Sequence, residues 1–268
     1  MYKAGFVNII GKPNAGKSSL LNDLMGEKLC IISPKAQTTR HRIKAFYTTD
    51  EVQIIFSDTP GLLDPKYKLQ ECMMEAINEA IEDADILLYL TTIEEKPNEH
   101  TIPKLLDEAN APLVIGINKI DMASSQSEVE DLMAQWQSHF PNARIIALSA
   151  LHHFNTQKVL DTLIELLPEH EPYFDGESLS DRNMRFFVSE LIREKIFLQY
   201  HQEIPYSCEV IIESFIEEDT HTKIYATIYV ARESQKAILI GQQGKAIKQL
   251  GIEARVAIED LLDTRVYL

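Results

Sequence analysis

The stretch G-K-P-N-A-G-K-S, residues 11–18, decides the first part of the fold. It follows a short apolar segment, 6–10, and precedes a helix-sized segment, 18–25. Glycines let successive backbone N–H groups of such a loop turn toward phosphate oxygens at the positive end of the next helix. The Lys17 ammonium would reach the β and γ phosphates, and the Ser18 hydroxyl would take one Mg²⁺ position. This strand–loop–helix context predicts a nucleotide-phosphate site rather than a chance match.

A second motif, N-K-I-D at residues 118–121, predicts which base is bound. The Asp121 carboxylate can accept hydrogen bonds from guanine N1–H and N2–H₂, whereas adenine offers no such pair of donors. A site of this kind discriminates strongly, because the wrong base leaves a polar group unpaired. Lys119 would lie along the base plane, and Asn118 would brace the loop. The tripeptide S-A-L, residues 149–151, could offer a backbone N–H to guanine O6.

Between these motifs, D-T-P-G at residues 58–61 follows the apolar segment 52–56. On its own this tetrapeptide is an ordinary turn. After a phosphate loop, the Asp58 carboxylate can hold Mg²⁺ through water, and the Gly61 N–H can sense the γ-phosphate. The next residue is Leu62, which cannot orient a water molecule by hydrogen bonding as a glutamine would. We therefore expect hydrolysis to use another device or to be slow without a partner.

The segment Q-T-T-R-H-R, residues 37–42, lies between the phosphate loop and D-T-P-G. A threonine here can bind Mg²⁺ only when the γ-phosphate is present, which makes a nucleotide-ordered switch. Thr38 and Thr39 are both candidates, and a polar surface loop is the simpler alternative. Arg40 and Arg42 could stabilise transition-state charge, although surface or RNA-contacting roles are favoured.

Alternating apolar and helical segments predict an α/β first domain with a mostly parallel six-stranded sheet. Segments 42–47 and 52–56 have only the turn T-T-D between them and predict an antiparallel hairpin at one edge. Ligand sites of such sheets gather beyond the carboxyl ends of the strands. The predicted strands are 6–10, 42–47, 52–56, 86–90, 113–117 and 144–148, and the predicted helices are 18–25, 69–83, 127–140 and 155–167.

After a segment rich in proline and acids, the order changes to helix, strand, strand, helix, helix. Near its end, I-G-Q-Q-G-K-A-I at residues 240–247 has a predicted helix on each side. A lone G-x-x-G is usually a helix–helix turn. With apolar residues before and after, the pattern matches the loop by which KH domains clamp a nucleic-acid backbone.

Composition and charge limit the possible functions. The 268 residues are 45% hydrophobic, as in a packed globular protein, and no apolar run approaches the roughly 20 residues of a membrane span. The N-terminal apolar segment reads as a strand rather than a signal peptide. Three widely spaced cysteines fit a reduced, cytoplasmic setting.

A net charge of −15 argues against a nucleic-acid partner, but the charge is unevenly distributed. Residues 1–177 carry 15 Lys and Arg against 27 Asp and Glu, and residues 178–268 carry 11 against 14. Residues 232–255 contain five basic and two acidic side chains. A solvated helix face explains this on charge alone, and the sign also suits a phosphate-bearing partner.

The chain resembles the Era family, bacterial GTPases with a C-terminal KH domain, over nearly its whole length. The resemblance rests on G-K-P-N-A-G-K-S-S-L-L-N, K-A-Q-T-T-R-H-R, D-T-P-G, N-K-I-D, S-A-L, S-E-L-I-R-E-K, I-P-Y-S-C-E-V and I-G-Q-Q-G-K-A-I-K-Q-L-G. It implies a P-loop GTPase domain at 1–170, a linker at 171–182 and an α+β type II KH domain at 183–268. Family members continue past V-Y-L with a strand and a basic tail, so we expect the last strand to be cut short.

The resemblance also implies GTP hydrolysis coupled to maturation of the small (30S) ribosomal subunit, with the KH domain on the 3′ end of 16S rRNA. Cofactors would be GTP or GDP, Mg²⁺ and, because Asn14 is present and the glutamine absent, K⁺. We expect a cytoplasmic monomer without a transmembrane segment, with peripheral association at the inner face of the cell membrane left open. Alternatives are a GTPase of tRNA modification or large-subunit assembly, and a non-catalytic RNA chaperone.

By this resemblance Thr39 rather than Thr38 is the switch threonine. The candidate catalytic residues are Lys17, Thr39, Asp58 and Gly61, and the candidate Mg²⁺ ligands are Ser18, Thr39 and Asp58. The candidate nucleotide-binding residues are Gly11, Asn14, Ala15, Gly16, Lys17, Ser18, Ser19, Asp58, Thr59, Pro60, Gly61, Asn118, Lys119, Asp121, Ser149, Ala150 and Leu151. The candidate RNA-binding residues are Ile240, Gly241, Gln242, Gln243, Gly244, Lys245 and Lys248.

Overall fold

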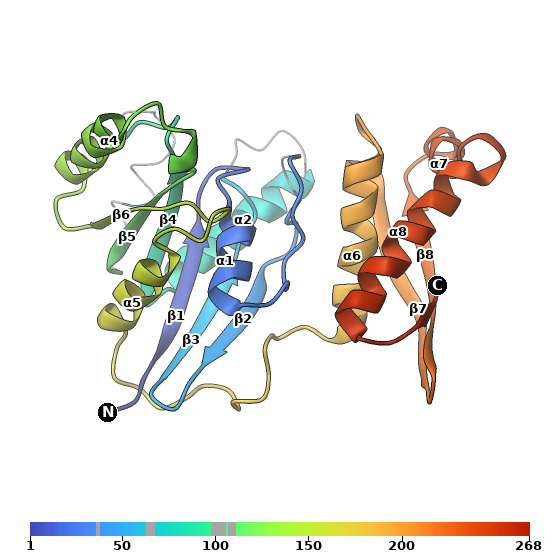
Figure 1. Ribbon diagram of the computed structural model, residues 1–268, viewed down its shortest axis with the longest axis horizontal. Coiled ribbons are helices and arrows are strands. Elements are labelled where there is room, and N and C mark those ends of the chain that lie inside the picture. The colour runs from blue at the N-terminus through green and yellow to red at the C-terminus, as the bar shows by residue number, and fades with distance from the viewer. Residues whose placement is uncertain (36–37, 63–67, 98–105, 107–110) are drawn as a thin grey trace. The chain divides into compact units, whose positions relative to one another are not determined.

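The structure, a computed structural model, describes residues 1–35, 38–62, 68–97, 106 and 111–268 (Figure 1). These residues form two compact units. The first unit contains residues 1–30 and 39–181, and the second contains residues 31–38 and 182–268. Gln37, the first residue of the predicted switch segment, lies outside the described residues.

The first unit is built on a six-stranded sheet. Its order is β2 (Ile43–Thr48), β3 (Val52–Asp58), β1 (Lys3–Ile10), β4 (Ile86–Thr92), β5 (Leu113–Asn118) and β6 (Arg144–Ala147). Neighbouring strands pair in parallel except β2 and β3, which form an antiparallel pair at the edge. The predicted mostly parallel sheet and its edge hairpin are both confirmed.

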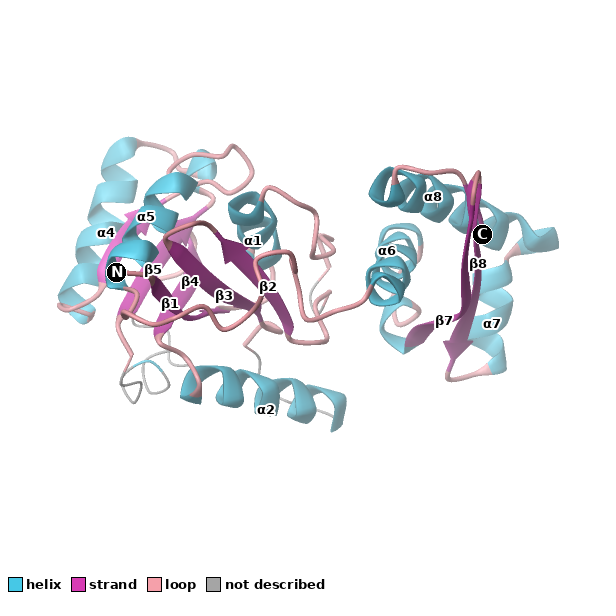
Figure 2. Ribbon diagram, turned by 90° about the horizontal axis from the view of Figure 1, so that it is seen from below, coloured by secondary structure: helices cyan, strands magenta, loops and turns pink. Residues whose placement is uncertain are grey.

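Helices cover both faces of this sheet. Figure 2 shows α1 (Lys17–Met25) and α2 (Lys68–Glu82) on opposite sides of it. Helix α4 (Gln126–His139) begins where the Ser125 hydroxyl accepts the Glu128 N–H at 3.2 Å, a capping interaction that fixes its first turn. Side chains of α2 and α4 meet strand residues in one core cluster around Trp136 and Tyr89. Helix α5 (Thr156–Leu166) contacts α1.

The predicted linker lies along the first unit for most of its length. The side chain of Gln53 on β3 accepts the N–H groups of Tyr173 (2.7 Å) and Phe174 (3.0 Å). The Phe174 ring stacks on Phe46 with centroids 4.1 Å apart. The aromatic side chains of this otherwise polar segment explain why the segment packs against the sheet instead of extending into solvent.

The second unit has the element order predicted for it. Helix α6 (Met184–Gln199) precedes β7 (Cys208–Glu218) and β8 (His221–Val230), which pair antiparallel. Helices α7 (Glu233–Ile240) and α8 (Lys245–Leu262) follow, and β9 (Val266–Tyr267) pairs in parallel with β8. The third strand, which the sequence predicts to be cut short, is thus present over two residues.

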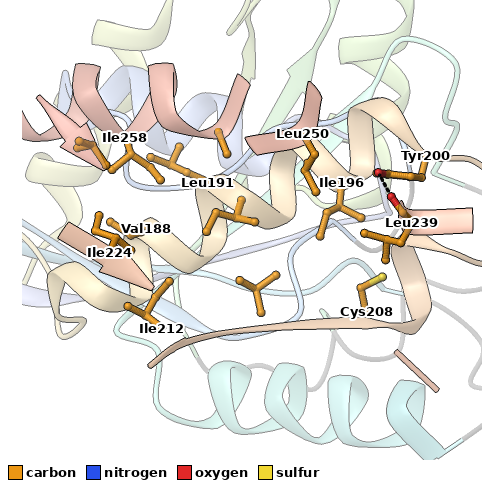
Figure 3. Close-up of a cluster of buried hydrophobic side chains, with 14 of the residues drawn as sticks. Val188, Leu191, Ile196, Tyr200, Cys208, Ile212, Ile224, Leu239, Leu250 and Ile258 are labelled. Carbon is orange, nitrogen blue, oxygen red and sulfur yellow. Dashed lines mark hydrogen bonds between the residues drawn. The ribbon is translucent and has the colours of Figure 1, made fainter. Parts of the chain in front are cut away.

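The core of the second unit is an aliphatic cluster between α6, α8 and the inner face of the sheet (Figure 3). At one end of it the Tyr200 hydroxyl donates to the Leu239 carbonyl at 2.7 Å, which joins the end of α6 to α7. Burial raises the pKa of Tyr200 to about 12. Val266 of the two-residue third strand belongs to this hydrophobic cluster. Within the described ranges, no helix of either unit combines the length and the apolar character that a membrane span requires.

Candidate functional site

The predicted phosphate loop connects β1 to α1, as the motif requires. Gly11, Asn14 and Gly16 all have positive φ angles (152°, 62° and 98°), which curl the backbone of the loop. A Cβ atom at Gly16 would lie 2.2 Å from Nδ2 of Asn118, so only glycine fits there. The loop is therefore shaped by glycines that no side chain could replace.

Lys17 begins α1 and is 6% exposed. Its ammonium donates to the carbonyls of Gly11 (3.1 Å) and Lys12 (3.0 Å) within the same loop. Burial lowers the Lys17 pKa to about 8, and the charge of Asp58 opposes this shift. The loop thus holds a desolvated cation at the place where nucleotide phosphates are predicted.

Asp58 ends β3 and is fully buried. Its Oδ2 accepts hydrogen bonds from the hydroxyls of Ser18 (2.7 Å) and Thr39 (3.2 Å), which are 3.1 Å from each other. Burial raises the Asp58 pKa, whereas Lys17 and hydrogen bonds from Ser18, Cys30 and Thr39 lower it. Three segments far apart in the sequence therefore bring two hydroxyls and one carboxylate to a single point.

These three oxygen-bearing side chains fit a magnesium site. The Oδ1 atom of Asp58 is buried and has no hydrogen-bond partner among the described residues. Mg²⁺ prefers carboxylate and hydroxyl oxygens and keeps several waters. An orphaned carboxylate oxygen beside two hydroxyls is the donor set that this ion takes. Thr38, the alternative switch threonine, instead bonds Ser33 (2.6 Å) and the Lys35 carbonyl (2.7 Å).

Asn118 joins the base-reading motif to the phosphate loop. Its Nδ2 donates to the Ala15 carbonyl at 2.8 Å, and its Oδ1 accepts the Ala150 N–H at 3.0 Å. The side chain is 2% exposed, so both bonds are shielded from water. One amide thus connects three of the predicted motifs.

Asp121 lies beyond β5 beside the S-A-L segment. Its carboxylate accepts the Ser149 hydroxyl and lies 3.9 Å from Nε2 of His152. The Ser149 hydrogen bond, with weaker help from other groups, lowers the pKa of Asp121. The carboxylate is therefore ionised and partly exposed, as an acceptor for two base N–H donors must be. Leu151, also predicted here, is 74% exposed.

D-T-P-G packs against the phosphate loop. A Cβ atom at Gly61 would lie 2.6 Å from the Pro13 nitrogen, and the Thr59 hydroxyl donates to the Ile9 carbonyl at 2.7 Å. The Leu62 N–H donates to the Gly11 carbonyl at 3.0 Å, and its side chain packs on the core. Leu62 therefore serves packing, at the position where a glutamine would orient water.

Arg42 forms hydrogen bonds and an ion pair within the first unit. Its guanidinium forms two 2.7 Å hydrogen bonds with Asp83 and also donates to Ser57 and Asn8. These contacts bind the start of β2 to the end of α2. Arg42 is thus a structural link within the first unit.

The predicted RNA-binding loop connects α7 and α8. Gly241, Gln243 and Gly244 have positive φ angles of 72°, 54° and 74°. A Cβ at Gly241 would lie 2.6 Å from that of Ala246, whereas one at Gly244 would meet nothing within 4 Å. Gln242, Gln243, Lys245 and Lys248 are exposed. The loop is therefore closely packed at Gly241 and has open space at Gly244.

Two residues near the nucleotide motifs escaped the sequence analysis. Cys30 is buried, and its thiol is one of the groups that lower the pKa of Asp58. Glu95 is buried and lies 3.2 Å from the Lys12 ammonium. Neither belongs to a spaced motif. For Glu95 the one available signal was an acidic residue a few positions beyond a predicted strand end.

Comparisons with known proteins agree with this geometry. Residues 6–119 match a family described as 50S ribosome-binding GTPase, and residues 203–268 match the KH domain family. The GTPase Era of Geotalea daltonii is 43% identical over all of this chain and 91% of its own length. The chain belongs to the Era family of GTPases. The GTPase Era of Staphylococcus epidermidis is 40% identical, with 100% and 90% of the two chains covered.

Solved structures of the family share the whole fold. A crystal structure of Era in complex with MgGDPNP and nucleotides 1506–1542 of 16S ribosomal RNA has a TM-score of 0.93 and 35% identity, covering 100% of this chain and 92% of that one. A crystal structure of a variant of Aquifex aeolicus Era bound to GDP·AlF4⁻ has a TM-score of 0.93 and 36% identity, covering 99% and 92%. The predicted family, fold class and GTPase activity are confirmed.

Proposed function

We propose that this Era-family chain hydrolyses GTP with Mg²⁺ and binds the 3′ end of 16S rRNA through its second unit, in assembly of the 30S subunit. The observation that carries the enzymatic part is the convergence of the Ser18 and Thr39 hydroxyls on Oδ2 of Asp58, within 3.2 Å, beside a buried Oδ1 that has no hydrogen-bond partner among the described residues. The relative with 16S rRNA nucleotides in its structure supports the RNA part.

Ser18 and Thr39 would bind Mg²⁺ through their hydroxyls, and Asp58 would do so through water. Bound there, the ion adds positive charge beside the β and γ phosphates, where negative charge grows in the transition state. Lys17 leaves the carbonyls of Gly11 and Lys12 and donates to the phosphates instead. Thr39 can reach the ion only in one loop conformation, so the bound nucleotide sets the conformation of the segment before β2.

A group other than residue 62 must orient the attacking water molecule, because the Leu62 side chain packs on the core. Lys17, the Gly61 N–H and the loop N–H groups stabilise phosphate charge but do not position a nucleophile. Hydrolysis therefore uses another device or is slow without a partner, and K⁺ next to Asn14 is a candidate activator. Faster GTP turnover in KCl than in NaCl would support this cofactor, and equal turnover would eliminate it.

The second unit supplies the RNA surface. Gly241 and Gly244 allow a backbone to approach closely, and Lys245 and Lys248 place positive charge at the same end of α8. The match to a 50S ribosome-binding GTPase ends at residue 119 and lies wholly within the first unit, so it does not favour the large subunit. The KH match and the relatives' coverage favour the 16S reading over tRNA modification. The expected location is the cytoplasm.

One binding experiment tests the RNA assignment and its dependence on the bound nucleotide. Affinity for an oligonucleotide of the 16S 3′ end should be measured with GDP and with a non-hydrolysable GTP analogue, beside a scrambled oligonucleotide. We expect the native sequence to bind more tightly than the scrambled one, and by a nucleotide-dependent amount. Equal binding of both sequences would refute the RNA assignment, and identical affinity in both nucleotide states would refute the coupling.

A further inference from the structure

Glu95 is a buried carboxylate outside every motif described above. It follows β4 by three residues and is 4% exposed. Its N–H closes a turn on the Thr92 carbonyl at 3.0 Å. Taking a carboxylate out of water is unfavourable unless donors replace its hydration. The hydrogen-bond donors around the Glu95 carboxylate therefore indicate its role.

Three donors surround the carboxylate. The Tyr89 hydroxyl donates to Oε1 and the Thr91 hydroxyl to Oε2, both at 2.8 Å. The Lys12 ammonium lies 3.2 Å from Oε1. Tyr89 and Thr91 are fully buried on β4, so the sheet itself fixes where the carboxylate lies. Lys12 is the member of the group that comes from another segment.

Lys12 is the second residue of the phosphate loop, and its backbone organises that loop. The Lys12 carbonyl accepts the Lys17 ammonium at 3.0 Å and the Ala15 N–H at 3.3 Å. Gly11, just before it, lies so close to β4 that a Cβ would come within 2.2 Å of the Leu90 carbonyl oxygen. The first turn of the loop thus has two contacts with this region, backbone packing against β4 and a charge pair with Glu95 just beyond it.

We propose that Glu95 is a positioning residue for the phosphate loop, acting through Lys12. The pair holds the loop in its binding shape before a nucleotide arrives, which lowers the ordering cost of binding. It also engages the Lys12 ammonium, so the two lysines of the loop have separate partners. Because the loop meets phosphates common to GDP and GTP, the pair supports both nucleotides equally. Its loss changes KM and leaves kcat in place.

Glu95→Gln tests this role, because it keeps the shape of the side chain and removes the charge. The dissociation rates of fluorescent GDP and of a fluorescent GTP analogue should both rise about tenfold, with kcat at saturating GTP changed less than about twofold. Glu94→Gln is the matched control, since Glu94 is an exposed carboxylate one residue away. It should leave both rates as they are.

A double-mutant cycle separates positioning from general damage. Lys12→Met should raise the dissociation rate as Glu95→Gln does, and the double variant should be no faster than either single one, because all three lose the same contact. Lys12→Arg restores a cation and should rescue slow dissociation. Additive effects, or an unchanged rate in Glu95→Gln, would overturn the proposal. If Glu95→Gln does not fold, equal rates for Lys12→Met and Lys12→Arg would overturn it instead.

Discussion

The two units hold their functional groups in opposite ways. In the first, Lys17, Asp58 and Asn118 are 6%, 0% and 2% exposed and hydrogen-bonded to neighbouring segments. In the second, the polar side chains of the G-Q-Q-G loop and the two lysines after it are exposed. A nucleotide is small and densely charged, so a buried, prearranged site suits it, whereas a single strand passes over an open surface. A single substitution in the first unit should therefore disturb the whole nucleotide site. A single substitution in the second unit should weaken RNA binding only through the contact that it removes.

The largest effect should come from Lys17→Ala. This change removes the buried cation of the phosphate loop, which donates to the carbonyls of Gly11 and Lys12. GTP affinity should fall by at least about a hundredfold, which corresponds to ~2.7 kcal/mol. Titration calorimetry measures the loss, with the exposed Lys28→Ala as control. An unchanged GTP affinity would contradict the prediction that nucleotide binding depends on this buried cation.

Asp121→Asn should come next, because it alters the base contact and leaves the buried cation of the phosphate loop in place. The asparagine amide offers guanine one acceptor and one donor in place of two acceptors. Its NH₂ group would therefore face one of the two guanine N–H donors. GTP affinity should fall by about a hundredfold, and affinity for the xanthine nucleotide should rise. Competition between GTP and XTP gives the ratio directly. A variant that still prefers guanine would show that another group reads the base.

Gly244→Asp should have a moderate effect on RNA alone. The site has open space for a side chain but a φ of 74°, so Gly244→Asn is the control that carries the same backbone strain without charge. Binding of the 16S 3′-end oligonucleotide should weaken about tenfold for aspartate and much less for asparagine. If both variants lose affinity equally, strain rather than phosphate repulsion is the cause.

Tyr200→Phe should have the smallest effect, a loss of about 1 kcal/mol in stability of the second unit. It removes the hydrogen bond to Leu239. Since folding raises the Tyr200 pKa from 10.0 to about 12, the folded state favours the neutral phenol. The contribution of the neutral Tyr200 phenol to the free energy of unfolding is complete below about pH 10 and is lost as pH rises toward 12. Urea unfolding from about pH 9 to 11 should show this decline in the native chain and not in the variant.

Contiguous patterns were readable from the sequence, and contacts between distant segments were not. The phosphate loop, D-T-P-G and N-K-I-D each follow a strand, so sheet topology alone brings them to one edge. The edge hairpin followed from two strands with no helix pattern between them. KH topology followed from element order together with G-Q-Q-G.

What the sequence could not give depends on side-chain direction. Glu95 bends back to Lys12 from a distant part of the chain, and Cys30 reaches Asp58 from a segment that carries no motif. A linker is expected at 171–182, yet Tyr173 and Phe174 attach this segment to β3 through Gln53. Arg42 could not be assigned until Asp83 was found beside it.

The central claim is that nucleotide state in the first unit and RNA binding in the second are linked. The most direct test is GTP turnover of the full chain with and without a 16S 3′-end oligonucleotide, beside a scrambled oligonucleotide of equal length. Linkage between the sites predicts faster turnover with the native oligonucleotide than with the scrambled one. The same rate in all three conditions would contradict it.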